Sequence, residues 1–212
     1  MKKVFRAGRC LAIWLLLVTM AFSLPATSAE KKTLLVVGDS LSAAFNLPQG
    51  SGWVDLLNEY LEHQAPEWRV INAAVSGETT GGGLTRLPAL LRQHQPEIVL
   101  LQLGGNDGLR GLPPTRIQNN LQQMIELSHA AEAQVLLAGI LLPPNYGRRY
   151  LEQFEAIFPS LAQDNQLPLV PFLLEGVADR PELMQDDGIH PTAEAQARIL
   201  ETVWLELRPL LQ

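Results

Sequence analysis

Apolar residues fall into two kinds of run along the chain, and the two kinds alternate. Short continuous runs are typical of parallel strands buried on both faces, whereas apolar residues spaced three and four apart indicate amphipathic helices. The predicted strands span residues 33–37, 69–73, 98–103, 134–140 and 167–173. The predicted helices span residues 53–63, 115–131, 150–164 and 192–210, with one more helix carrying the leucine stripe from 84 to 91.

Strands that alternate with helices imply right-handed crossovers and a parallel sheet. We therefore predict one α/β domain with three α/β/α layers, in which a five-stranded parallel sheet has the flavodoxin-like order 2-1-3-4-5. In that order the first and third strands are neighbours, and open sheets of this kind bind ligands beside the carboxyl ends of such strands. Ser40 and Asn106 follow these two strands, so we expect them to lie close together.

Residues 1–29 have the layout of a secretory signal peptide. Four basic residues come first, an apolar run spans residues 11–24, and the small residues 26–29 end it, with cleavage expected after Ala29. An uncleaved membrane anchor is the alternative, but the run is short of the ~20 residues that a spanning helix needs. The sequence thus predicts a mature domain of residues 30–212, periplasmic or secreted, without a stable membrane anchor.

Charge and cysteine content narrow the classes of partner. The whole chain has a formal charge of −6, and removal of the basic leader leaves 12 basic against 22 acidic residues. Such an acidic surface argues against nucleic acid or an anionic membrane as the main partner. Cys10 is the only cysteine and lies in the leader, which excludes a disulfide, a thiol nucleophile and a cysteine metal site from the mature protein. We expect a monomer that acts on a small molecule.

Ser40 stands where a nucleophile would, on a sharp turn directly after the first strand. A serine hydroxyl needs a base within hydrogen-bond reach, and that base needs an orienting partner. His190 is a natural base, because imidazole titrates nearest to neutral pH, and Asp187 can fold back onto its ring through Gly188. Pro191 disfavours a helical conformation at His190, which keeps the histidine on the loop before the last helix.

Four blocks along the chain carry these residues: Gly38-Asp39-Ser40-Leu41, Val75-Ser76-Gly77, Gly104-Gly105-Asn106-Asp107 and Asp187-Gly188-Ile189-His190. In this order they resemble the SGNH, or GDSL-type, hydrolase family, and most of all its small bacterial periplasmic thioesterases, arylesterases and lysophospholipases. The resemblance covers the chain after about residue 30. It implies catalysis by Ser40, Asp187 and His190, with the N–H groups of Ser40 and Gly77 and the amide of Asn106 as oxyanion donors.

The residue types suit the roles that the resemblance implies. Glycine at position 77 leaves room for close approach and can adopt a positive φ, and the Asn106 side chain offers an N–H that aspartate lacks. His63, His94 and His129 lie on amphipathic helices among polar neighbours, where a solvated surface is expected. Asp186 is the alternative orienting carboxylate, although the three-residue spacing favours Asp187.

The expected reaction is hydrolysis of esters and thioesters through an acyl-serine intermediate. No metal-ligand cluster and no phosphate-binding Gly-Lys-Ser/Thr motif occurs in the sequence, so neither metal nor cofactor is predicted. The loops after the third and fourth strands are expected to give the acyl group an apolar lining from Leu109, Leu112, Leu141, Leu142 and Pro143. Tyr146, Arg148 and Arg149 could contact a polar head group or form a solvated loop.

Two other functions fit parts of the sequence. An acetyl esterase acting on carbohydrate or peptidoglycan would keep the fold and the catalytic residues, but it should have an open, polar groove with aromatic platforms. A periplasmic module that binds anions without catalysis would make the serine, histidine and aspartate a coincidence.

Overall fold

The computed structural model describes Met1 and residues 31–212. The predicted signal peptide, together with Cys10, lies outside the described residues. Within residues 31–212, no helix has both the length and the apolar character needed to cross a membrane.

Five parallel strands form one sheet in the predicted order, β2-β1-β3-β4-β5. Continuous apolar runs make the central strands, because both of their faces are covered by helices. The strands are β1 (Lys32–Gly38), β2 (Trp68–Asn72), β3 (Ile98–Gln102), β4 (Gln134–Ala138) and β5 (Leu169–Val170). Strands β1 and β3 are hydrogen-bonded neighbours, with Gly38 opposite Gln102 at their carboxyl ends. The prediction of the fold class and strand order is confirmed.

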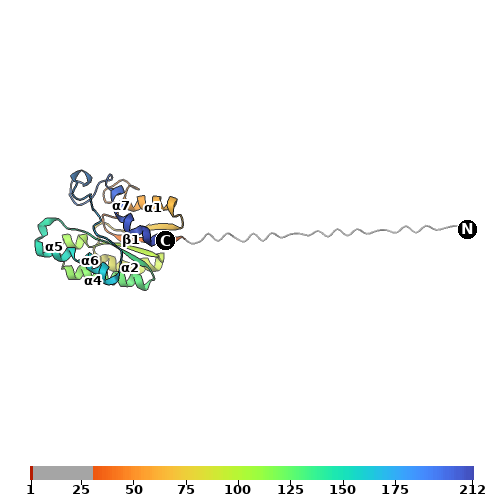
Figure 1. Ribbon diagram of the computed structural model, residues 1–212, viewed down its shortest axis with the longest axis horizontal. Coiled ribbons are helices and arrows are strands. Elements are labelled where there is room, and N and C mark those ends of the chain that lie inside the picture. The colour runs from red at the N-terminus through yellow and green to blue at the C-terminus, as the bar shows by residue number, and fades with distance from the viewer. Residues whose placement is uncertain (2–30) are drawn as a thin grey trace.

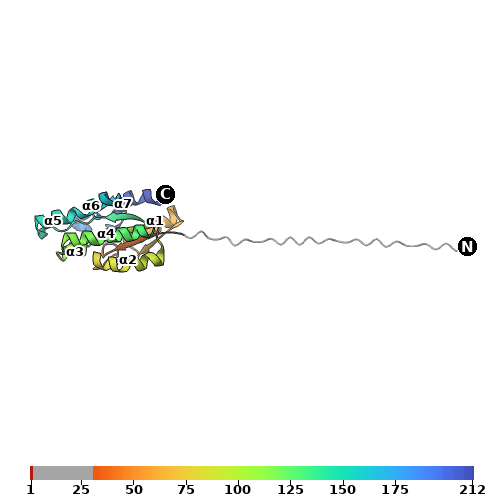
Figure 2. The same ribbon diagram turned by 90° about the horizontal axis from the view of Figure 1, so that it is seen from below.

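Helices cover both faces of this sheet (Figure 1). On one face lie α1 (Trp53–Gln64) and α7 (Gln196–Leu207). On the other face α2 (Thr80–His94), α4 (Pro114–Ala130) and α6 (Ile157–Asn165) lie side by side (Figure 2). The remaining pieces are α3 (Gly105–Leu109), α5 (Arg148–Glu155) and the 3-10 turns η1 (Pro144–Tyr146), η2 (Pro181–Leu183) and η3 (Arg208–Leu211).

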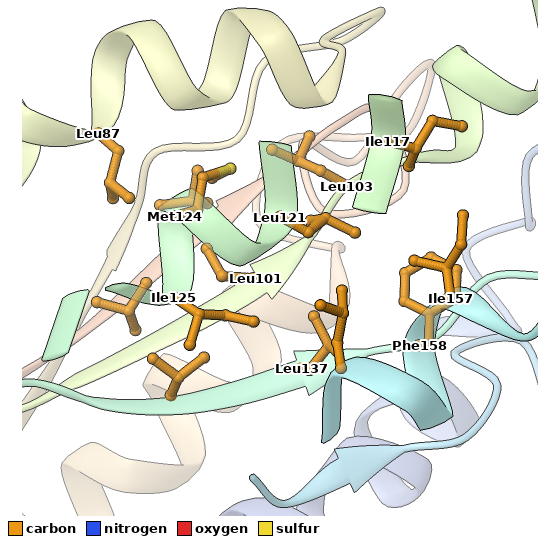
Figure 3. Packing of buried hydrophobic residues seen from close by; sticks show 14 of the residues in the cluster. Leu87, Leu101, Leu103, Ile117, Leu121, Met124, Ile125, Leu137, Ile157 and Phe158 are labelled. Carbon is orange, nitrogen blue, oxygen red and sulfur yellow. The ribbon is translucent and has the colours of Figure 1, made fainter. Parts of the chain in front are cut away.

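Side-chain alternation along the strands divides the core into two parts. In β1, Leu34 and Val36 pack toward α1 and α7, while Leu35 and Val37 pack toward the opposite helices, and all four are fully buried. Figure 3 shows leucines of β3 and β4 meeting apolar side chains of α2, α4 and α6. The sheet is thus packed against helices on both faces, and this packing fixes the positions of its strand ends.

Prolines explain three of the places where the predicted elements were too long; the strand predicted over 134–140 also ends early, at Ala138. The single helix predicted over 150–164 is two helices, α5 and α6, because Pro159 has no N–H to donate to the carbonyl of Glu155. The strand predicted over 167–173 is only two residues long, since Pro168 and Pro171 flank it and cannot donate to a ladder. The last helix ends at Leu207 and tightens into η3, which contains Pro209.

Two further differences lie at helix starts. Residues 193–195 form turns, so α7 begins at Gln196 rather than at Thr192. The residues directly after β3, which the pattern left without helical character, form the short helix α3. This helix carries Asn106 in its first turn.

Candidate functional site

Ser40 lies in the turn that follows β1. The turn is closed by Asp39, whose backbone carbonyl accepts the N–H groups of Ser42 and Ala43 at 3.2 and 2.9 Å. The Asp39 carboxylate also accepts the N–H of Leu41 at 3.1 Å. These bonds fix the backbone on both sides of Ser40 and set its hydroxyl at the rim of the sheet.

His190 and Asp187 come from the irregular segment between η2 and α7, and His190 is 150 residues away from Ser40 along the chain. Nε2 of His190 lies 2.8 Å from the Ser40 hydroxyl oxygen, and Nδ1 lies 2.6 Å from a carboxylate oxygen of Asp187. Gly188 has φ +65°, in the left-handed region that glycine adopts without strain. The turn through Gly188 therefore brings the carboxylate onto the ring, and the structure joins all three residues in one chain of hydrogen bonds.

The Asp187 carboxylate is held in its charged form. Partial desolvation acts to raise its pKa, but hydrogen bonds outweigh it and lower the pKa to about 2. Its other oxygen accepts the backbone N–H groups of His190 and Ile189, each at 2.9 Å. An anion on Nδ1 fixes the tautomer in which Nε2 can accept a proton from Ser40.

Asn106 reaches the same site from the other strand end. Its side-chain amide donates to the Asp39 carboxylate at 3.3 Å, and Gln102 of β3 donates to that carboxylate at 3.0 Å. Burial raises the pKa of Asp39, partly offset by these hydrogen bonds. Asp39 thus ties the turn that carries Ser40 to the strand and helix that carry Asn106, a role the sequence pattern did not indicate.

Gly77 lies in the exposed turn between β2 and α2, with φ +78°. Its carbonyl accepts a hydrogen bond from the Arg110 guanidinium at 3.1 Å, which links this turn to the loop after α3. Among the described residues, the backbone N–H groups of Gly77 and Ser40 have no hydrogen-bond acceptor. Both therefore remain able to donate to a bound ligand.

A cavity of about 780 Å³ opens beside Ser40, Asn106 and His190. Of the predicted apolar lining, Leu109, Leu141, Leu142 and Pro143 border this cavity. Leu112 does not: its backbone carbonyl binds the Tyr150 hydroxyl and it is absent from the cavity wall. The sequence did not predict the part of the wall that comes from residues 172–189. It includes the apolar residues Phe172, Leu173, Leu174, Ala178, Met184 and Ile189 together with Glu175 and Asp179.

Other side chains weighed from the sequence lie elsewhere. His63 and His129 are exposed and His94 is half-buried, and none of them borders the cavity. Tyr146 donates to the carbonyl of Leu109 at 2.9 Å, and Arg148 pairs with Glu152 at 2.7 Å on an exposed surface. No group of three or more metal-ligating side chains occurs within residues 31–212.

The geometry now has a counterpart among known proteins. The family model described as "GDSL-like Lipase/Acylhydrolase family" matches residues 36–198, a range that includes all of the sheet except the start of β1, the cavity walls and the site described above. The chain belongs to the GDSL-like lipase/acylhydrolase family. The predicted family is thereby confirmed, and the chain is an acyl hydrolase of the GDSL type rather than a binding module without catalysis.

Several proteins are similar to this chain along almost their whole length. Esterase TesA of Pseudomonas aeruginosa is 50% identical over 192 residues, covering 91% of this chain and 96% of TesA. Thioesterase 1/protease 1/lysophospholipase L1 of Escherichia coli is 46% identical over 198 residues, covering 93% of this chain and 92% of that protein. The arylesterase of Vibrio mimicus is 49% identical over 195 residues, covering 92% and 98%.

Solved structures of GDSL-type esterases agree with this fold. The crystal structure of TesA superposes with a TM-score of 0.82 at 52% identity, covering 84% of this chain and 99% of that one. The psychrotrophic esterase EstA from Pseudoalteromonas, solved with monoethylphosphonate as inhibitor, gives a TM-score of 0.81 at 41% identity and covers 85% and 99%.

Proposed function

We propose that this protein is a serine hydrolase that cleaves carboxylic ester and thioester bonds of acyl substrates through an acyl-serine intermediate. The observation that carries the proposal is the continuous hydrogen-bonded chain from the Ser40 hydroxyl through His190 to the Asp187 carboxylate, at 2.8 and 2.6 Å. The three hydrogen-bonded residues lie beside a cavity whose walls are mostly apolar.

Acylation begins when the Ser40 oxygen attacks the carbonyl carbon of the substrate. The hydroxyl proton passes to Nε2 of His190, and the Asp187 carboxylate stabilises the imidazolium that forms. When the tetrahedral intermediate collapses, the same proton passes from Nε2 to the departing alcohol oxygen or thiol sulfur. The acyl group is left on Ser40 as an ester.

The negative charge on the substrate oxygen is stabilised by three donors. These are the backbone N–H groups of Ser40 and Gly77 and the Asn106 amide, which keeps one N–H for the substrate while the other binds Asp39. Each hydrogen-bond donor that already points toward the developing charge lowers the activation free energy by about 3 kcal/mol. Deacylation repeats these steps with water as the nucleophile and Ser40 as the leaving group. His190 again takes the proton from the attacking oxygen.

The cavity favours an acyl chain over a sugar. Leucine, isoleucine, phenylalanine, methionine and proline side chains make up most of its wall, and its volume of about 780 Å³ is in the range of pockets that enclose small ligands. Phe172 is the only aromatic ring among the described wall residues other than the His190 imidazole. A carbohydrate esterase would need aromatic platforms, and apart from Phe172 the described wall residues offer none.

The test is hydrolysis of p-nitrophenyl esters of increasing acyl length by the mature protein and by its Ser40→Ala variant. We expect kcat/KM to rise with acyl length and Ser40→Ala to abolish turnover. Cys10 lies outside the mature domain, so trapping with a phosphonate ester should add one adduct, at Ser40, which mass spectrometry detects. Turnover of acetyl esters alone, with acetylated polysaccharide preferred, would instead favour the carbohydrate esterase.

The same proposal includes export of the chain. Residues 1–29 would direct it to the periplasm or the medium and be removed after Ala29, leaving a monomeric domain that starts at Glu30. N-terminal sequencing of the protein recovered from the periplasmic fraction tests the cleavage site, and light scattering after gel filtration tests the monomer. A recovered protein that still begins at Met1 would contradict the cleavage.

A further inference from the structure

Gln185 occupies a position that the reaction described above does not use. It lies two residues before Asp187, half-buried, and its side-chain amide faces the turn that carries the nucleophile. Nε2 of Gln185 donates to the backbone carbonyl of Phe45 at 3.1 Å, and its Oε1 accepts from the side chain of Asn46 at 3.1 Å. The Gln185 amide thus contacts Asn46 and Phe45, which lie 139 and 140 residues before it in the sequence.

The same glutamine also binds the segment that carries the base. Its second Nε2 hydrogen bond goes to the carbonyl of Pro191 at 2.9 Å, and its backbone N–H donates to the carbonyl of His190 at 2.8 Å. Each donor and the acceptor of the amide therefore has a partner. All of the partners lie within six residues of Ser40 or directly at His190.

Phe45, one of the residues that Gln185 binds, contacts both Ser40 and His190. The N–H of Phe45 donates to the carbonyl of Ser40 at 3.2 Å, and the Phe45 ring lies 4.5 Å from the His190 imidazole. A shift of Phe45 would thus move both the backbone of the nucleophile and the face of the base.

We infer that Gln185 is a positioning residue, which with Asn46 holds the turn of Ser40 and the loop of His190 at the separation that proton transfer needs. The inference rests on the proposed function, because it assumes that Ser40 is the nucleophile and His190 its base. Proton transfer is sensitive to such separations, and misplacement by about 1 Å can cost about 100-fold in rate.

The first test compares two variants of the mature protein with the parent on a soluble short-chain p-nitrophenyl ester. Gln185→Ala removes every side-chain bond of the bridge, whereas Gln185→Glu keeps the acceptor for Asn46 and replaces the two donors with a carboxylate beside two carbonyls. We expect kcat to fall about 10-fold to 100-fold in both, while KM changes less than twofold. Inactivation by a phosphonate ester, which also needs His190 to activate Ser40, should slow by the same factor.

Gln122→Ala is the matched control. Gln122 and Asn165 exchange two side-chain hydrogen bonds, at 3.1 and 2.8 Å, between α4 and α6, and neither residue borders the cavity. This glutamine therefore also bridges two distant segments, and its loss tests whether removing any such bridge lowers kcat. We expect kcat to remain within twofold of the parent, whatever the change in melting temperature.

A double-mutant cycle with Asn46→Ala tests whether the two residues act as one unit. We expect kcat of the double variant Asn46→Ala/Gln185→Ala to be no lower than kcat of Gln185→Ala, because Gln185→Ala alone already breaks the bridge to which Asn46 belongs. The inference is overturned if Gln185→Ala keeps kcat within twofold, if the two losses multiply, or if Gln122→Ala loses as much activity. Retained turnover in Ser40→Ala would defeat the proposed function itself, whereas an inactive Ser40→Ala beside a fully active Gln185→Ala defeats this inference alone.

Discussion

Asp187 and Asp186 offer a decisive comparison, because two adjacent carboxylates have different surroundings. The Asp187 carboxylate accepts three hydrogen bonds, from the His190 ring and from two backbone N–H groups. Asp186 is exposed, and its side chain makes no hydrogen bond or ion pair to the described residues. Replacing each in turn by asparagine removes one negative charge from nearly the same place.

Catalysis should distinguish the two variants first. A carboxamide at position 187 can donate to Nδ1 of His190 and so stabilise the tautomer whose Nε2 carries the proton, which cannot accept one from Ser40. By analogy with serine hydrolases in general, we expect kcat for Asp187→Asn to fall by about 10⁴-fold. Asp186→Asn should keep kcat within twofold, measured on the same ester at pH 7 to 8.

Stability gives an independent magnitude. A pKa that falls from 3.8 to about 2 on folding corresponds to about 2.5 kcal/mol at 1.36 kcal/mol for each pH unit. The side chain is 39% exposed, so solvent screening reduces this to about 1 kcal/mol. Because the pKa is lower in the folded state, the stabilisation is complete above about pH 4 and is lost as the pH falls toward 2.

Urea unfolding at pH 7, 4 and 2.5 measures this effect. We expect the parent to be about 1 kcal/mol more stable than Asp187→Asn at pH 7, with a difference that shrinks between pH 4 and 2.5, while Asp186→Asn follows the parent. A stability difference that stays constant down to pH 2.5 would refute the electrostatic reasoning. Loss of activity in Asp186→Asn, with Asp187→Asn still active, would show that Asp186 rather than Asp187 orients His190.

Three further substitutions test other parts of the structure. Asn106→Ala should lower kcat about 100-fold to 1,000-fold with little change in KM, as steady-state kinetics would show, because it removes an oxyanion donor. Met184→Trp should fill part of the cavity and lower the ratio of octanoyl to acetyl ester turnover by about tenfold or more, so an unchanged ratio would place the acyl chain elsewhere. Gly139→Ala puts a Cβ 2.2 Å from the backbone oxygen of Pro171 and should cost about 1–3 kcal/mol in urea unfolding, whereas Gly81→Ala, whose Cβ would have ordinary contacts, should cost nothing.

Local patterns were sufficient for the architecture, whereas the roles of the residues in the four blocks came from the family resemblance. Apolar runs predict strands because a parallel sheet covered on both faces leaves no polar positions, and the strand order then places Ser40 near Asn106. The pattern failed where a covalent property of proline overrides periodicity, as at Pro159, or where a segment has no periodicity. The wall from Phe172 to Ile189 belongs to the second kind, since irregular backbone gives no signal of which side chains face a cavity.

The contacts of Asp39 and Gln185 were invisible for a different reason. Each residue has partners more than 60 residues away in sequence. Asp39 belongs to the block that carries Ser40, but the block does not show that its carboxylate binds Gln102 and Asn106, and Gln185 belongs to none of the four blocks. Asp39 could be found only by asking which group satisfies the Asn106 amide once the strands are paired. Gln185 needs the full coordinates, because both acceptors of its side-chain amide are backbone carbonyls, which any sequence provides.

The site therefore combines two ways of holding a side chain in place. Ser40 and Asn106 follow β1 and β3, whose separation is fixed by the hydrogen bonds of the ladder and by the buried core on both faces. His190 has no such element beneath it, and polar ties to its own loop and to the turn of Ser40 hold it instead. In the proposed mechanism the nucleophile and the oxyanion donor keep fixed positions, whereas the base serves first Ser40 and then the leaving group at slightly different positions. Hydrogen bonds restrain the base while allowing this small excursion, so substitutions in the ties should change kcat and substitutions in the sheet should change stability.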